Sequence, residues 1–326
     1  MRGMLKAYAL CPDGTIEIAS EVDEVAALWA RGDVKLWIDV EHPYREQMEA
    51  LASVFKLDAE SVEDCLAGEQ RPRIDDYDHY LFLMLYGAVA SETELTFNPR
   101  KICIFFNTRY LITAHQEPVL SVRYLFRRLE RNTDLLKRGI DHLFFQLIDG
   151  IVDNYVLCAE TYEDQLDTLE QESLETPPRP DLMANVNRLR RDLIGFRRLV
   201  VSTRELVLPL SRRDYPHVSD DLAWDFRHVI DHLTYAWELA EGLREVAQSI
   251  RENYSDQLAR RANDLMRTLT IFASILLPLS LISGVYGMNI MLWPGPSAPY
   301  AFPLVLGAMG GVATVMFVYF RKRGWL

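Results

Sequence analysis

The sequence predicts an α+β membrane protein: a cytoplasmic α/β domain over residues 1–135, a helical hairpin and stalk over 136–267, and a transmembrane hairpin over 268–326. Three observations support this fold class. Short β-rich runs alternate with helical runs at the start of the chain, and long helical patterns follow them. From Thr268 to Phe320 the chain then contains no Asp, Glu, Lys or Arg.

The composition is that of a folded, acidic protein. Of the 326 residues, 25% are charged and 49% are hydrophobic, which excludes a disordered chain. The formal net charge of −12 argues against a nucleic-acid partner, which would require a basic surface. This average hides a division, because residues 1–267 carry a net charge of −15, the uncharged run none, and Arg321–Arg323 the remaining +3.

The cysteines and the N-terminus indicate a body in the cytoplasm. The first ten residues lack a long apolar run, so we expect no signal peptide. The four cysteines form no C-x-x-C pair, so we expect buried thiols in a reducing compartment rather than disulfides or a zinc ribbon. They are Cys11, Cys65, Cys103 and Cys158.

The first part of the chain shows both periodicities of an α/β domain. Three segments with helical spacing lie at Glu21–Ala30, Tyr44–Phe55 and Ala59–Leu66. Six segments rich in β-branched and aromatic residues predict strands. These are Leu5–Leu10, Thr15–Ala19, Lys35–Asp39, Tyr80–Ala88, Ile102–Phe106 and Tyr110–His115.

Three long helices are predicted next. Ile140–Leu174 and Asp181–Leu208 form an antiparallel hairpin, because the prolines around Pro177 force a break between them. A third helix begins near the N-cap Ser219, and no proline stops it before Pro278. Its roughly 70 residues would extend about 100 Å. A helix of that length needs partners along most of it, which favours an oligomer with a central stalk.

Two apolar runs predict membrane spans. Leu269–Val285, extended to residues 268–288, and Tyr300–Phe320 each approach the roughly 20 residues that cross a bilayer. A buried core helix is the alternative, but two consecutive uncharged runs make it a poor explanation. Asn289–Pro299 predicts a loop without positive charge, whereas basic residues precede the first span and follow the second. The positive-inside rule then places both chain ends in the cytoplasm.

The first span has one face of small, polar or flexible residues, and its other faces are mainly Leu, Ile and Phe. Such a seam either packs closely against other helices or lines a water-filled path, and the pattern alone leaves both open. Steps of three and four residues along this face give Asn263, Met266, Thr270, Ala273, Leu277, Ser280, Gly284 and Gly287.

Other candidate sites are weaker. His228 and His232 are four residues apart, a spacing that can hold a metal, but no third ligand follows at an obvious offset. The acidic run Glu160–Glu175 could attract cations, although a solvated helix face explains it better. No nucleophile elbow, P-loop or dinucleotide fingerprint is present. We therefore expect neither an enzyme nor an organic cofactor.

Four motifs resemble one family. Tyr286–Asn289 contains a Gly-Met-Asn signature between the two spans, and this arrangement resembles the CorA divalent-cation channels. Gln70–Arg73, Leu147–Tyr155 and Gly324–Leu326 are also similar to segments of that family. The resemblance covers nearly the whole chain, and it includes the order of the acidic body, hairpin, stalk and spans.

The resemblance implies a homopentamer with a pore lined by the first span. Mg²⁺ loses its hydration shell reluctantly, so a ring of Asn289 side chains would select it through that shell, with Gly287 letting the backbone turn. Met288 would pack rather than bind, because a thioether is a poor ligand for a hard ion. The remaining implied pore positions are Asn263 as a polar ring, Met266, Leu269 and Leu277 as a hydrophobic gate, Thr270 and Ser280 as hydroxyl steps, and Ala273 and Gly284.

The chain departs from the family pattern in two places. The outer loop has no acidic residue between Ile290 and Tyr300, where the family commonly has one. The family also binds regulatory intracellular magnesium through acids between neighbouring bodies. The corresponding positions fall near Ser91 (beside Glu92), His228 and Glu252, and only Glu252 keeps the acid. Glu92 and Glu252 are therefore the candidate regulatory ligands.

The first functional hypothesis is a magnesium channel in the cytoplasmic (inner) membrane, with cobalt or nickel as secondary ions. The second is a zinc transporter of the same superfamily, which the neutral loop and His228 favour. The third is a membrane-anchored sensor that transports nothing. A simple anchor needs neither the polar seam nor the loop motif, which disfavours the third hypothesis. The expected partners are further copies of this chain, divalent cations and the lipid bilayer.

Overall fold

The computed structural model describes residues 3–68, 70–87, 98–132, 134–175, 179–215, 217–288 and 300–325. The chain forms two compact units, Met1–Arg251 and Glu252–Leu326, which we name the N-terminal and the C-terminal unit. Helix α8 (Asp220–Tyr286) contributes residues to both. The finer division into three parts that the sequence predicts stays a prediction.

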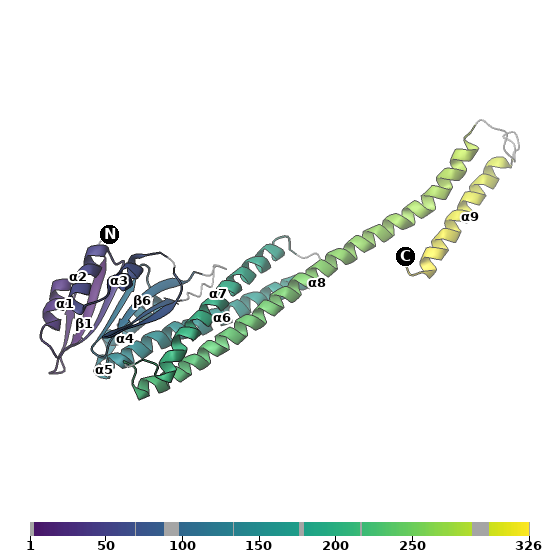
Figure 1. Cartoon of the computed structure of the whole chain (residues 1–326). Coiled ribbons are helices and arrows are strands. Elements are labelled where there is room, and N and C mark those ends of the chain that lie inside the picture. Colours follow the sequence, from purple (N-terminus) through teal and green to yellow (C-terminus); the bar gives the residue numbers. More distant parts are fainter. Residues whose placement is uncertain are drawn as a thin grey trace. The chain divides into compact units, whose positions relative to one another are not determined.

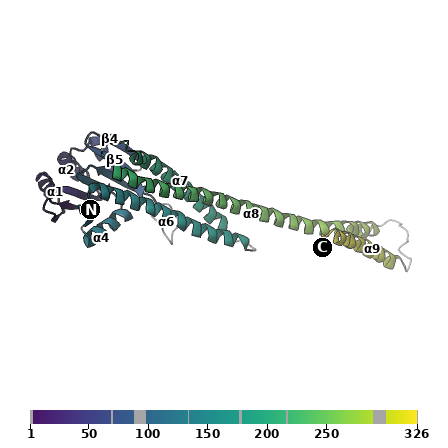
Figure 2. The ribbon, with the colours of Figure 1, turned by 90° about the horizontal axis from the view of Figure 1, so that it is seen from below.

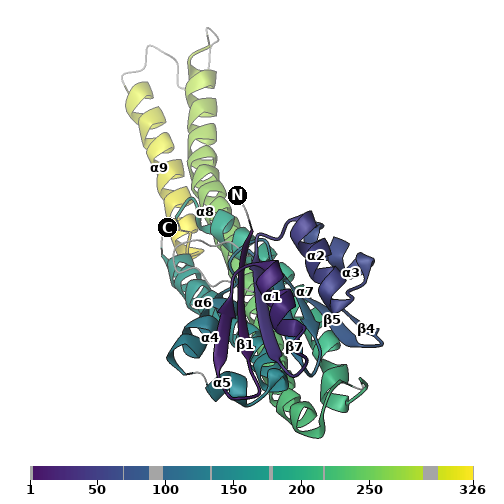
Figure 3. The same ribbon diagram turned by 90° about the vertical axis from the view of Figure 1, so that its left-hand side faces the viewer.

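The N-terminal unit contains a seven-stranded sheet, which is nearly all antiparallel (Figure 3). Its strand order is β2-β1-β3-β7-β6-β5-β4, and the one parallel pair joins β3 to β7. The strands are β1 (Met4–Leu10), β2 (Ile16–Ala19), β3 (Lys35–Glu41), β4 (Arg73–Tyr77), β5 (Tyr80–Gly87), β6 (Arg100–Phe106) and β7 (Tyr110–His115).

Helices cover both faces of this sheet. The face under α1 (Val22–Trp29), α2 (Arg45–Phe55) and α3 (Ala59–Leu66) forms an apolar cluster that includes Leu36, Ile38 and Val40 of β3. On the other side, Phe144 of α6 stacks on Phe106 with ring centroids 4.0 Å apart. Burial on both faces explains why β5 and β7 are buried at every position and have mainly apolar sequences.

Three long helices form the rest of this unit (Figures 1 and 2). They are α6 (Ile140–Leu174), α7 (Leu182–Arg212) and the first part of α8, and the short α4 (Leu120–Arg131) and α5 (Asp134–Lys137) precede them. A series of buried residues in this part of α8 recurs every three or four positions, the repeat of a coiled-coil seam. The series is Leu222, Phe226, Val229, Leu233, Ala236, Ala240, Leu243, Ala247 and Ile250, and Ala223 is buried beside it.

The C-terminal unit is a helical hairpin, in which α9 (Ala301–Lys322) lies antiparallel beside the end of α8 (Figure 1). Ile271 of α8 and Phe320 of α9 are its buried apolar side chains. Trp325 stacks on Phe320, and the guanidinium of Arg267 lies 5.6 Å from the Trp325 ring centroid. These contacts hold the C-terminal end of α9 against α8.

The structure confirms the predicted elements and adds some. All six predicted strands, the three short helices and the three long helices are present, and the four cysteines are free and buried. Strand β4 and helices α4 and α5 were not predicted. The expected end of α7 near Leu208 was too early, because Pro209 lies inside the helix and the chain stays helical to Arg212.

The seam of α8 predicts a clear difference between two aromatic substitutions. Phe226 is fully buried against Phe144 and Phe145, so Phe226→Ala should lower the free energy of unfolding by about 3–5 kcal/mol. Trp224 is 68% exposed, so Trp224→Ala should change it by no more than about 0.5 kcal/mol. Urea denaturation of the purified full chain, followed by circular dichroism, measures both, and equal losses would contradict the assigned seam.

Candidate functional site

The two apolar helices of the C-terminal unit have the properties of membrane spans. Each contains an 18-residue window of mean hydropathy 2.0, and only 6% of that window in α8 and 0% in α9 is buried. A core helix of a soluble protein would be mostly buried. The alternative of a buried core helix therefore fails for these two helices, which are too apolar to be left in water.

Helix α9 covers one face of α8 and leaves the polar seam uncovered. Ile271, Ile275 and Ile282 are buried or partly buried toward α9. By contrast, Leu269 and Leu277 are each 70% exposed and Met266 is 59% exposed. All eight positions predicted from the sequence as pore-lining are exposed in the single chain. They are Asn263, Met266, Leu269, Thr270, Ala273, Leu277, Ser280 and Gly284.

Thr270 presents its oxygen in a form suited to a cation. Its Oγ1 donates its hydrogen to the backbone carbonyl of Met266, one turn earlier, at 2.7 Å. Because the hydrogen is used inside the helix, the hydroxyl lone pairs remain available on the exposed surface. Mg²⁺ and its bound waters interact with such oxygen acceptors.

The start of the Gly-Met-Asn motif tightens the end of α8. The amide of Gly287 donates to the carbonyl of Ser283 at 2.9 Å, and that of Met288 to the carbonyl of Val285 at 3.3 Å. A Cβ placed on Gly287 would lie 3.2 Å from the Ser283 oxygen, so a side chain here would crowd the last turn. The Met288 side chain is 56% exposed, and Asn289 lies outside the described residues.

The structure describes one of the two candidate regulatory ligands, so their joint role stays a prediction. Glu252 lies on α8 with an exposed side chain, at the first position of the C-terminal unit. Ser91 and Glu92 lie outside the described residues. His228 lies on α8 in the N-terminal unit, with its ring centroid 4.2 Å from that of His232.

The structure places two carboxylates beside His232, which the spacing of residues in the sequence did not reveal. Ligand atoms of Asp149 and Asp153 on α6 and of His232 on α8 all lie within 4.8 Å of one another. Nδ1 of His232 is 3.2 Å from Oδ1 of Asp153. Oδ1 of Asp149 is shielded from solvent without a hydrogen-bond partner in the described residues. We name these three residues the Asp-His cluster.

The Asp-His cluster could hold a divalent cation. Burial and, after it, the neighbouring charge of Asp153 raise the pKa of Asp149, and a bound cation would oppose this shift. An imidazole nitrogen beside two carboxylates suits Zn²⁺, Co²⁺ or Ni²⁺ better than Mg²⁺, which prefers oxygen. The two acids belong to the Leu147–Tyr155 motif, but their approach to His232 depends on how α6 packs on α8.

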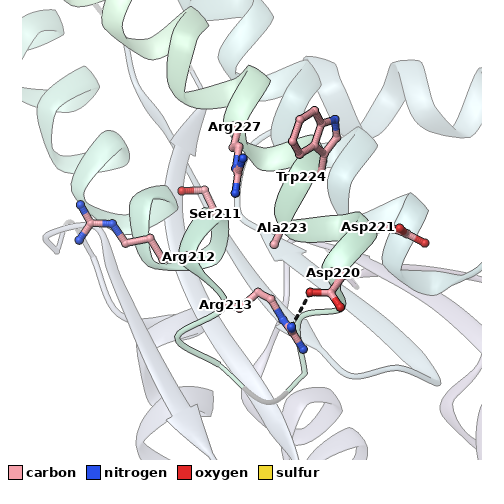
Figure 4. Close-up of a pocket in the computed structure, with 8 residues that line it drawn as sticks. All are labelled: Ser211, Arg212, Arg213, Asp220, Asp221, Ala223, Trp224 and Arg227. Atoms are coloured by element: carbon pink, nitrogen blue, oxygen red, sulfur yellow. Dashed lines mark ion pairs between the residues drawn. The ribbon is translucent and has the colours of Figure 1, made fainter.

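A further polar hollow, of about 590 Å³, lies where α7 ends and α8 begins (Figure 4). Arg213, in the left-handed conformation at the end of α7, forms an ion pair with Asp220 of α8. Arg227 lies over the ring of Trp224, and Ser219 accepts a hydrogen bond from the amide of Leu222. These contacts close the turn that starts α8, and we assign them this structural role.

These features define a class of protein. A folded acidic unit is joined through one helix to a hairpin of membrane-spanning type, whose α8 keeps a face of small and polar residues uncovered. Such a face serves transport through a membrane or assembly within it.

The comparisons identify the family. Residues 33–322 match the family described as CorA-like Mg2+ transporter protein. The chain belongs to this CorA-like family of divalent-cation transporters, which are not enzymes.

Individual relatives agree with this assignment but differ in the ion they are named for. The chain is 31% identical over 289 residues (89% of each chain) to a putative metal ion transporter, YfjQ, of Bacillus subtilis. It is 29% identical over 293 residues to the cobalt/magnesium transport protein CorA of Thermotoga maritima, covering 89% of this chain and 83% of that one. It is 23% identical, over 98% of this chain and 95% of the relative, to the zinc transport protein ZntB of Yersinia pseudotuberculosis.

The fold agrees with that of a solved member. The complete structure of the CorA magnesium transporter from Methanocaldococcus jannaschii matches with a TM-score of 0.86 over 99% of both chains. The sequences are 19% identical, so this match establishes the fold alone.

The Asp-His cluster predicts a binding site that two substitutions remove. Asp153→Asn and His232→Gln should each weaken Co²⁺ binding to the purified full chain by about tenfold or more, measured by calorimetric titration. Binding should also weaken as the pH falls, because protons compete for the carboxylates and the imidazole.

His79→Gln is the control for the cluster, because His79 is a surface histidine in the β4–β5 turn. It should leave Co²⁺ binding unchanged. Co²⁺ affinity that is the same in wild type and in His232→Gln would show that the three residues hold no metal.

Proposed function

We propose that the chain forms a homopentameric channel that carries Mg²⁺ across the cytoplasmic membrane, with α8 lining the pore. The observation that carries this proposal is the uncovered face of α8. Its Asn263, Thr270, Ser280 and Gly284 suit a water-filled path better than lipid, whereas Phe272 and Leu276 on other faces suit lipid. Two helices per chain are too few to enclose a path, so several copies must surround it.

Selection of the ion is assigned to the Gly-Met-Asn motif. Five Asn289 amide oxygens at the pore mouth would accept hydrogen bonds from the waters around Mg²⁺, so that the ion enters hydrated. Gly287 allows the tight last turn of α8 that precedes this ring. The outer loop carries no charge, so it neither concentrates cations nor repels them.

Gating is assigned to the apolar positions of the same face. In a pentamer, the side chains of Met266, Leu269 and Leu277 would form apolar rings, which block ions when the path between them loses water. With both chain ends in the cytoplasm, the inside-negative potential drives entry. A divalent ion gains about 4.6 kcal/mol per 100 mV, twice the value for a single charge.

Zinc transport is the alternative function, and cobalt or nickel would be secondary ions of a magnesium channel. The nitrogen-containing Asp-His cluster and the ZntB relative favour zinc. The complete Gly-Met-Asn motif and the greater similarity to a cobalt/magnesium transport protein favour magnesium. Regulation by a cytoplasmic cation is compatible with either function, through the Asp-His cluster or through Glu92 and Glu252.

Ion flux into liposomes tests the proposed function. Wild-type protein should admit Mg²⁺ to vesicles loaded with a magnesium-sensitive dye, independently of a proton gradient. Asn289→Ala should reduce this flux to background, because it removes the ring of acceptors. Asn253→Ala makes the same chemical change on α8 outside the polar seam, and it should conduct like the wild type.

Three other outcomes would contradict the proposal in different ways. Normal Mg²⁺ flux in Asn289→Ala would show that the Gly-Met-Asn motif does not select the ion. Zinc entry coupled to internal acidification would establish the alternative function. No flux of any ion would leave a membrane-anchored protein that does not transport.

The apolar gate predicts a gain of function. Leu277→Ser should wet the constriction and raise Mg²⁺ flux at high internal Mg²⁺ several-fold, because a hydroxyl lowers the barrier to water. Leu276→Ser, one residue away on a face assigned to lipid, is the matched control and should leave the flux unchanged. Equal effects of the two substitutions would show that Leu277 does not face the pore.

A further inference from the structure

One face of the sheet carries charged residues where a helix-covered sheet ordinarily has apolar ones. In β3, Ile38 and Val40 point into the apolar core, so Asp39 and Glu41 point to the opposite face. The strand register places Lys6 of β1 and Thr113 of β7 beside Asp39. In the next row, it places Met4 and His115 beside Glu41.

Helix α4 lies over this face and leaves a hollow. Its Phe126 stacks on Trp37 of β3, with ring centroids 4.1 Å apart. Beyond this contact is a hollow of about 330 Å³, with Asp39, Glu41 and His115 on its floor and Arg123 and Arg127 of α4 on its rim. This volume falls at the lower end of the roughly 300–1,000 Å³ range of small-molecule sites.

The floor of the hollow is held in place by a buried hydrogen-bond network. His115 is 3% exposed and Asp39 is 7% exposed. Nδ1 of His115 is 2.8 Å from the carbonyl of Glu117, an acceptor, so this nitrogen carries a hydrogen. Nε2 of His115 is 3.2 Å from Oδ1 of Asp39, which also accepts the hydroxyl hydrogen of Thr113.

This network makes His115 a counter-ion for Asp39. Burial lowers the pKa of His115, but the hydrogen bond and the charge of Asp39 outweigh burial and leave this pKa raised. Trp37 completes the network by donating from Nε1 to Thr113 at 3.3 Å. A buried ion pair is a poor source of stability compared with apolar packing, so its place on the floor of an open hollow indicates a binding role.

The other charged residues of the hollow leave it with a net positive charge. Lys6 and Glu130 neutralise each other at 2.7 Å. Among the described residues, Arg123, Arg127 and Glu41 form no ion pair within 4.0 Å, although the charge of Arg127 also acts on Glu130. Two guanidinium groups on the helix therefore face one carboxylate on the sheet, which gives a net charge of +1 with the positive and negative groups on opposite walls.

We propose that this hollow binds a small amino acid with an acidic side chain, whose two carboxylates pair with Arg123 and Arg127 and whose ammonium group pairs with Glu41. The net charge of −1 on such a ligand matches the +1 of the site. Arginine is the side chain best suited to bind a carboxylate, because its planar donors form paired hydrogen bonds. The site is separate from the ion pathway, and its occupancy does not depend on transport.

Calorimetric titration of the purified full chain with L-glutamate and L-aspartate tests the proposal. At least one of them should bind below about 10 mM. Glutarate, which keeps both carboxylates but lacks the ammonium group, should bind at least about tenfold more weakly than L-glutamate. Glycine, which lacks the second carboxylate, should also bind more weakly than L-glutamate.

Substitutions locate the site. Arg123→Gln and Arg127→Gln should each weaken binding about tenfold or more, and Glu41→Gln should remove the preference for glutamate over glutarate. Arg131→Gln is the control, because Arg131 lies on α4 outside the hollow. All four residues are exposed or partly exposed, so the fold should survive these changes, and an unchanged melting temperature confirms it.

Several outcomes would overturn the proposal. If neither amino acid gives a heat of binding at 10 mM, the hollow is not a site for them. Binding that is unchanged in Arg123→Gln and Arg127→Gln would place the ligand elsewhere. Equal affinity for glutamate and glutarate would show a site for dicarboxylates, without the contact between Glu41 and the ammonium group.

Discussion

Helix α8 continues without a break from the helical bundle of the N-terminal unit into an apolar, largely unburied segment of the kind that spans a membrane. In lipid, backbone N–H and C=O groups must be satisfied within the protein, and α8 satisfies its own except at Pro278, which has no N–H to donate to the carbonyl four residues earlier. In the N-terminal unit the same helix is fixed by its apolar seam against α6 and α7, and in the C-terminal unit by the contacts of Ile271 and Phe320 with neighbouring side chains. The positions of the polar seam and of the Gly-Met-Asn motif follow from the register of this one helix.

The distribution of charge follows the same division. The N-terminal unit keeps an acidic, solvated surface, whereas the spans contain no charged residue and concentrate their polarity in the seam that α9 leaves uncovered. A membrane protein retains such groups where they contact other polar groups or water. This constraint connects the exposed Asn263, Thr270 and Ser280 to the proposed pore, and it accounts for the apolar residues on the other faces of α8.

The sequence predicted those parts of the fold that depend on local patterns. The bounds of α6 and the extent of α8 follow from helical periodicity, proline positions and the cap at Ser219, which act over a few residues. Strand β4 was missed because Arg73–Tyr77 contains three charged residues among five, and it becomes a strand only through pairing with β5. Helix α4 was missed although its apolar positions have helical spacing, because four arginines and a glutamate dilute the apolar signal.

The candidate sites, too, could be predicted only where they depend on a local sequence pattern. The polar seam lies on one helix, so its spacing was visible in the sequence. The Asp-His cluster joins Asp149 and Asp153 to His232 across some eighty residues of chain, and only the packing of α6 on α8 brings them together. The charged hollow beside α4 requires the register of three strands, which no local pattern specifies.

The central claim is that the polar seam of α8 faces water inside an assembly of chains. Single cysteines on α8, labelled in intact membranes with a membrane-impermeant thiol reagent, test it directly, since the native cysteines are buried. The account predicts labelling of Thr270→Cys, Ala273→Cys and Ser280→Cys that added Mg²⁺ slows, and no labelling of Leu276→Cys or Leu281→Cys. Uniform labelling of the two sets, or labelling of the leucine positions alone, would contradict a pore lined by this face.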